Sequence, residues 1–153
     1  MDRSSAGTTP WLRYQADLEK EGFCRDDAQE RAVRALDDLH RRLIEAESAR
    51  QGALGRWWGR VRGRPAEPVR GLYLWGGVGR GKTYLMDTFY ECLPFPEKLR
   101  VHFHRFMQRV HEELATLEGH KNPLELVADS MVKKARIICF DEFFVTDIGD
   151  AMI

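Results

Sequence analysis

Eight consecutive residues have the types and the spacing of a phosphate-binding loop. They are Gly76, Gly77, Val78, Gly79, Arg80, Gly81, Lys82 and Thr83, which match the pattern G-x-x-x-x-G-K-[ST]. The glycines let the backbone turn tightly and bring its N–H groups against phosphate oxygens. Lys82 supplies a positive charge for the β- and γ-phosphates, and the Thr83 hydroxyl can ligate Mg²⁺. The octet therefore predicts a site for a nucleoside triphosphate and Mg²⁺.

The segments on either side of the octet are the ones that such a loop needs. Residues 71–75 form a short apolar run typical of a strand, and residues 84–90 have the spacing of an amphipathic helix. The helix would direct the positive end of its dipole at the phosphates. A chance match is the alternative interpretation, and the order strand, glycine loop, helix argues against it.

A second motif, which is acidic, supplies the Mg²⁺ ligand and the water-activating group that triphosphate hydrolysis also needs. Residues 137–140 are four apolar residues, which indicates a strand buried on both faces, and Asp141 and Glu142 follow at its carboxyl end. Asp141 is the expected Mg²⁺ partner, and Glu142 is the expected base or water-positioning group. Without the glycine loop, this run would be interpreted as an ordinary strand end. The adjacent acidic pair favours hydrolysis over a small-molecule kinase.

The rest of the chain predicts an α/β fold preceded by helices. Thr9-Pro10 predicts a helix start with Gly22 as its stop, and Asp26 or Asp27 would cap a longer helix. The apolar stripe of that second helix is Ala32, Leu36, Leu39 and Leu43.

Beyond the phosphate loop, a strand is expected at residues 99–103 and a helix at 105–117. A short helix follows Asn122-Pro123, and another begins at Thr146-Asp147. This β-α-β-α-α-β series predicts a parallel sheet with flanking helices. We expect three segments: a helical segment over residues 1–50, a basic linker over 51–69, and the first part of a P-loop ATPase domain over 70–153.

Charge and composition limit the choice of partners. Lys and Arg together number 24, as do Asp and Glu, so net charge predicts no nucleic-acid partner. Residues 50–70 are an exception, with six arginines and a single glutamate, Glu67. A solvated linker is the simpler interpretation, and a contact surface for phosphate, an acidic protein or a membrane is the alternative.

The cysteines and histidines carry weaker signals. Cys24, Cys92 and Cys139 form no metal-binding pair, so reduced structural thiols are expected. No apolar stretch approaches the roughly 18 residues that a membrane span needs, and the N-terminus lacks the apolar segment of a signal peptide. These two features predict a cytoplasmic location. His102, His104 and His111 invite a metal hypothesis, but no ligand set is complete. Packing and hydrogen bonding are the favoured roles, and reading of nucleotide state stays open.

Several runs together resemble the ZapE/Afg-type ATPases, a branch of the AAA+ superfamily. These are residues 70–83, 101–107, 110–114 and 139–148, with looser similarity at Pro10-x-x-x-Tyr14 and Asp27-x-Gln29. The resemblance implies an AAA+ fold of the P-loop NTPase (ASCE) class that uses ATP. It also implies a homo-oligomer and an action on FtsZ division-ring polymers, which the protein would destabilise at the division site. The family roles fall on Lys82 and Thr83 in the loop and on Asp141 and Glu142 at the strand end.

Two other functions stay open: a nucleic-acid-dependent AAA+ motor or loader, and a nucleotide-binding adaptor without turnover. ZapE/Afg-type proteins are more than twice as long as this chain, which stops before their later sensor strand, arginine finger and helical lid. We therefore expect a fragment or a truncated gene product, poorly folded and inactive when residues 1–153 are expressed alone.

Overall fold

The computed structural model describes residues 7–51, 68–145 and 151. It divides into two compact units, Met1–Pro94 and Phe95–Ile153, each taken by itself below. The predicted linker at residues 51–69 lies almost wholly outside the described residues. The predicted helix start at Thr146-Asp147 lies outside them as well.

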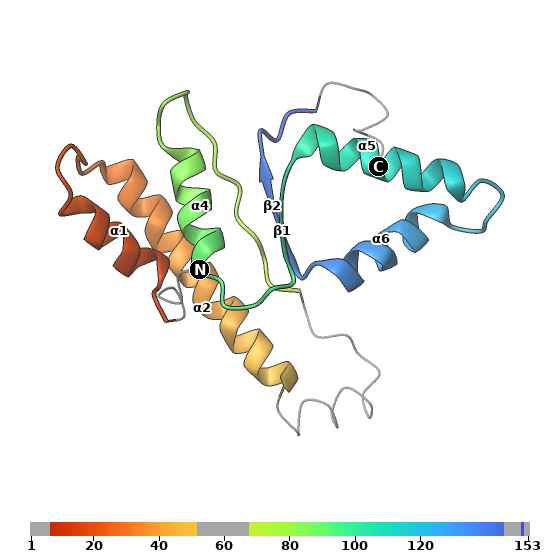
Figure 1. Ribbon diagram of the computed structural model, residues 1–153, viewed down its shortest axis with the longest axis horizontal. Helices are drawn as coiled ribbons and strands as arrows, with labels where there is room; N and C mark the ends of the chain where they lie inside the picture. The colour runs from red at the N-terminus through yellow and green to blue at the C-terminus, as the bar shows by residue number, and fades with distance from the viewer. Residues whose placement is uncertain (1–6, 52–67, 146–150, 152–153) are drawn as a thin grey trace. The chain divides into compact units, whose positions relative to one another are not determined.

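In its described residues, 7–51 and 68–94, the first unit contains the helices α1 (Pro10–Leu18), α2 (Asp27–Gln51) and α4 (Lys82–Cys92) (Figure 1). Both predicted N-terminal caps are confirmed. The Thr9 hydroxyl accepts a hydrogen bond from the Leu12 N–H, and Asp26 Oδ1 accepts from the N–H groups of Ala28 and Gln29. These contacts satisfy amide groups that have no partner within the helix.

The core of the first unit is where the three helices meet. Leu36 and Leu39 of the predicted stripe are buried, whereas Ala32 and Leu43 are only half-buried. The other buried core side chains of these helices include Tyr14, Val33, Leu85 and Phe89. Two polar bonds cross this core: His40 Nε2 lies 3.0 Å from the Cys92 carbonyl, and the Tyr84 hydroxyl donates to Asp17 over 2.7 Å.

Among its described residues, the second unit holds a parallel sheet of two strands, β1 (Lys98–His102) and β2 (Ile137–Asp141). The helices α5 (Phe103–Thr116) and α6 (Pro123–Lys134) form the connection between them, as parallel strands require (Figure 1). Lys98 pairs with Ile137 and His102 with Asp141, so both carboxyl ends lie at one edge. The two strands, the two helices between them and the parallel pairing that the sequence predicts are thus confirmed.

The strand predicted at residues 71–75 is wrong. Residues 68–77 carry neither helix nor strand, and Tyr73 and Trp75 are exposed. A strand is held by hydrogen bonds from a neighbouring strand, and in the described sheet β1 and β2 pair with each other only. Residues 71–75 therefore have the composition of a strand, but no described strand pairs with them.

The burial predicted for the strand Ile137–Asp141 is wrong in part. The sequence predicts that this strand is buried on both faces, but Cys139 is its only buried residue and the other four are half-buried. Burial raises the pKa of the Cys139 thiol to about 11, which keeps it protonated. All three cysteines are free thiols, and Cys24 is exposed rather than packed.

Candidate functional site

The glycine loop has the backbone that phosphate binding needs. Gly76, Gly79 and Gly81 have positive φ angles of 149°, 77° and 73°, which side-chain-bearing residues rarely adopt. A Cβ placed at Gly76, Gly77 or Gly79 would meet nothing within 4 Å. The loop is therefore open on the side of these glycines, so a ligand has room to reach the backbone.

Lys82 lies at the end of this loop and turns back over it. Its ammonium donates hydrogen bonds to the carbonyl oxygens of Gly76, over 2.8 Å, and Gly77, over 2.7 Å. The positive charge thus sits inside the curve of the loop, where a triphosphate would present its oxygens. Thr83 follows on the first turn of α4 and is exposed.

The start of α4 adds backbone donors at the same place. Gly81 is the N-cap residue and has no side chain with which to cap the helix. The first N–H groups of a helix have no partner within it and favour an anion there. Loop, lysine and helix start therefore fit a phosphate group, and the site residues 76–83 lie together in the first unit.

The acidic pair belongs to the second unit. Asp141 ends β2, and its Oδ2 accepts a hydrogen bond from the Arg100 guanidinium on β1 over 3.1 Å. Glu142 follows with φ of +51°, and its side chain is 82% exposed. Carboxylate oxygens are suitable Mg²⁺ ligands, but the cation beside Asp141 opposes a second one.

The histidine expectations need correction. His102, His104 and His111 are all exposed, so the predicted packing is wrong, whereas the predicted hydrogen-bonding role stays a prediction. The described residues also contain no group of three His, Cys, Asp or Glu side chains that could hold a metal ion. His102 ends β1, whereas His104 and His111 lie on α5. His102 Nδ1 instead lies 4.0 Å from Glu142 Oε2.

Sequence reasoning missed two contacts that reach the candidate site. The first is the contact of Arg100 with Asp141. The second is the contact of Arg80 with Gln29 and Asp26. Gln29 Nε2 donates to the Arg80 carbonyl over 3.2 Å, and Asp26 Oδ2 lies 3.1 Å from the Arg80 guanidinium. The only available signal was the loose family similarity at Asp27-x-Gln29.

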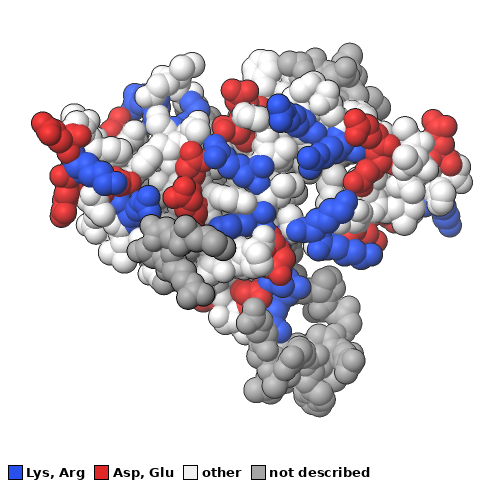
Figure 2. Space-filling view, viewed as in Figure 1, with Lys and Arg blue, Asp and Glu red and all other residues white. Residues whose placement is uncertain are grey.

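The surface charge in Figure 2 and the hydropathy of the described helices point to no further binding site. On the face shown in Figure 2, Lys and Arg side chains lie among Asp and Glu side chains. Within residues 7–51 and 68–145, no helix has both the length and the apolar character that a membrane crossing demands.

Comparison with known proteins identifies relatives over nearly the whole chain. The sequence profile of the AFG1-like ATPases matches residues 8–153. The chain is 47% identical over 151 residues to the cell division protein ZapE of Escherichia coli. The aligned residues cover 95% of this chain and 40% of ZapE. It is 32% identical over 174 residues to an uncharacterized protein of Schizosaccharomyces pombe, covering 95% of this chain and 38% of that one.

A third relative matches less of the chain. Lactation elevated protein 1 homolog B of Danio rerio is 41% identical over 97 residues, or 56% of this chain and 19% of that protein. No solved structure matches the chain. The chain spans about two fifths of the length of the first relatives that it matches.

Proposed function

The chain belongs to the AFG1-like ATPase family, and on that basis we propose that it contributes the nucleotide-binding part of an ATP-hydrolysing protein, including residues for hydrolysis. The observation that carries the proposal is the open glycine loop with the Lys82 ammonium directed into it. Exchange of two carbonyl partners for phosphate oxygens would turn neutral hydrogen-bond acceptors into charged ones. The attraction between the ammonium and the negative phosphate would then add to the hydrogen bonds.

Within this proposal each site residue has one task. The N–H groups of residues 76–83 hold the phosphates, Lys82 offsets their negative charge, and Thr83 and Asp141 hold Mg²⁺. The Mg²⁺ ion, when bound, neutralises charge that develops on the phosphate oxygens. Glu142 accepts a proton from the attacking water, as a carboxylate with an exposed side chain can.

For the protein client we propose the FtsZ division ring. The support is the name of the E. coli relative, a cell division protein, together with the resemblance described above. The proposal places the ATPase in the cytoplasm at the division site, where a homo-oligomer would destabilise FtsZ polymers while it hydrolyses ATP.

The test uses the complete gene product that contains this chain. Calorimetry with ATP should show binding that Lys82→Ala weakens by about 10- to 100-fold, because the lost bonds involve a charged group. Lys121→Ala, which removes an exposed lysine between α5 and α6, serves as the matched control. Equal ATP affinity in Lys82→Ala and wild type would reject the loop assignment.

The client is tested separately in the same preparation. Sedimentation of FtsZ polymers should decrease when the protein and ATP are both present, and Lys82→Ala should abolish the effect. Stimulation of ATP turnover by single-stranded DNA, with a steep dependence on salt, would instead support a nucleic-acid motor. ATP binding without turnover under either condition would support an adaptor.

A further inference from the structure

The first turn of α2 lies directly against the phosphate loop, although 51 residues separate Gln29 from Arg80. The Gln29 amide donates to the Arg80 carbonyl oxygen over 3.2 Å. A Cβ built on Gly81 would lie 2.7 Å from Gln29 Nε2, a distance at which a side chain at 81 would collide with this amide. Among the loop glycines, Gly81 alone has such a neighbour.

The orientation of one peptide group follows from this contact. In a trans peptide the C=O and the next N–H point in opposite directions, and no peptide bond in the described chain is cis. Because Gln29 holds the Arg80 carbonyl, the Gly81 N–H points away from α2. Gly81 N–H belongs to the loop that we propose binds phosphate, so its direction affects the affinity for the nucleotide.

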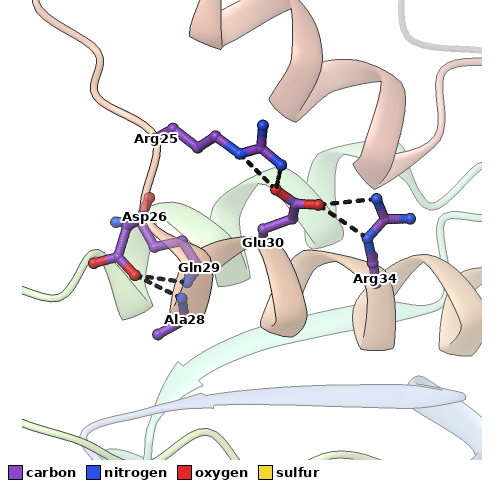
Figure 3. Close-up of polar contacts among 6 residues, drawn as sticks. All are labelled: Arg25, Asp26, Ala28, Gln29, Glu30 and Arg34. Atoms are coloured by element: carbon purple, nitrogen blue, oxygen red, sulfur yellow. Dashed lines mark hydrogen bonds and ion pairs between the residues drawn. The ribbon is translucent and has the colours of Figure 1, made fainter.

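The turn that presents Gln29 is held from both sides (Figure 3). Asp26 caps the Ala28 and Gln29 N–H groups, and Glu30 bonds both Arg25 and Arg34. These backbone hydrogen bonds from Gln29 and Ala28 hold the pKa of Asp26 below its usual value, as the nearby Arg80 charge also does. Asp26 Oδ2 in turn pairs with the Arg80 guanidinium, a second link to the loop.

The orientation of the Gln29 side-chain amide follows from its hydrogen-bond partners. Gln29 Oε1 is buried and has no hydrogen-bond partner among the described residues. A rotation of the amide would bring two oxygens together at the Arg80 carbonyl, so Nε2 must face it. The Gln29 side chain therefore donates to the loop through Nε2, while Oε1 is left without a partner among the described residues.

We propose that Gln29 is a positioning residue of the nucleotide site, which orients the Arg80–Gly81 peptide for phosphate and couples nucleotide occupancy to the N-terminal helix α2. This inference rests on the proposed nucleotide binding. It predicts reciprocity: a nucleotide stabilises the first turn of α2 as much as that turn improves nucleotide affinity.

The test compares Gln29→Glu with wild type in the complete gene product. The variant keeps the side-chain length but replaces the donor by a carboxylate facing a carbonyl oxygen. We expect KM for ATP to rise about tenfold while kcat stays within about twofold, because the loop contact acts alike on bound substrate and transition state. In wild type, ADP should also slow hydrogen exchange in the first turn of α2, and in Gln29→Glu it should not.

Glu45→Gln is the matched control, since it breaks an exposed ion pair with Arg41 farther along α2, away from the turn that presents Gln29. Its KM should equal that of wild type. A similar rise of KM in Glu45→Gln, an unchanged KM in Gln29→Glu, or a loss in kcat alone would each overturn the inference. Should Gln29→Glu fail to fold, Gln29→Met provides the same comparison. Absence of ATP binding in wild type would reject the proposed function instead.

Discussion

The Arg100 guanidinium on β1 donates a hydrogen bond to the Asp141 carboxylate at the end of β2, over 3.1 Å. Arg100 lies 41 residues before Asp141 in the sequence, and the pairing of β1 with β2 brings the two residues together. It therefore brings a fixed positive charge to the carboxylate that we propose binds Mg²⁺.

Arg100→Gln should strengthen the response to magnesium. Removal of a partly exposed charge of this kind is worth about 0.5–1 kcal/mol, so the half-saturating Mg²⁺ concentration for ATP turnover should fall about two- to fivefold. The measurement is a Mg²⁺ titration at fixed ATP. Arg109→Gln makes the same change of charge on α5 and should leave the titration unaltered; a weaker magnesium response in Arg100→Gln would contradict the prediction.

Glu142→Gln should bind ATP but hydrolyse it slowly. The amide has nearly the same shape as the carboxylate and cannot accept the proton of the attacking water, and general-base catalysis contributes about 10²–10⁴-fold. Single-turnover hydrolysis and calorimetry on the same sample separate the two effects. Turnover within about threefold of wild type would exclude Glu142 as the water-activating group.

Asp141→Asn should act on magnesium rather than on the proton transfer. Loss of a charged oxygen ligand should raise the half-saturating Mg²⁺ concentration for ATP turnover. An unchanged magnesium titration would remove Asp141 from the proposed ligand set.

Asp17 should make the packing of α1 sensitive to acid. Burial by itself raises the pKa of this carboxyl, but hydrogen bonds from Lys20 and Tyr84 outweigh it and hold the pKa below 3.8. A lowered pKa stabilises the folded state above the unfolded value, and that stabilisation is lost as pH falls through the folded pKa. The free energy of opening of α1, from hydrogen exchange, should therefore decrease below about pH 4. Asp17→Asn should remove this dependence, whereas Glu19→Gln, at the exposed end of α1, should keep it.

Tyr14→Phe should leave the first unit equally stable or stabilise it by up to about 1 kcal/mol. Tyr14 is fully buried, and its hydroxyl has no hydrogen-bond partner among the described residues. The matched comparison is Tyr84→Phe, which loses the bond to Asp17 and should destabilise the unit. Hydrogen exchange in α1 and α2 measures both; a destabilised Tyr14→Phe would mean that the hydroxyl has a partner in solution.

The sequence predicted best those features that depend on neighbouring residues. The caps at Thr9 and Asp26 act on amides two or three residues away, and the two helix starts that they mark were predicted correctly. The stop predicted at Gly22 was late, because α1 ends at Leu18. The strand at residues 71–75 was wrong because a strand also depends on a partner elsewhere in the chain. For the same reason neither Arg100 beside Asp141 nor Gln29 beside Arg80 could be anticipated, since each contact joins elements far apart in sequence.

The left-handed backbone at Glu142 has a consequence for protein engineering. A residue with a Cβ pays about 1–2 kcal/mol at φ of +51°, and glycine does not. Selection for heat resistance alone would thus favour Glu142→Gly at the very position where hydrolysis is proposed to need a carboxylate. A thermostability screen of this protein would gain melting temperature and lose turnover with one substitution, so variants from such a screen should be sorted by ATP consumption first.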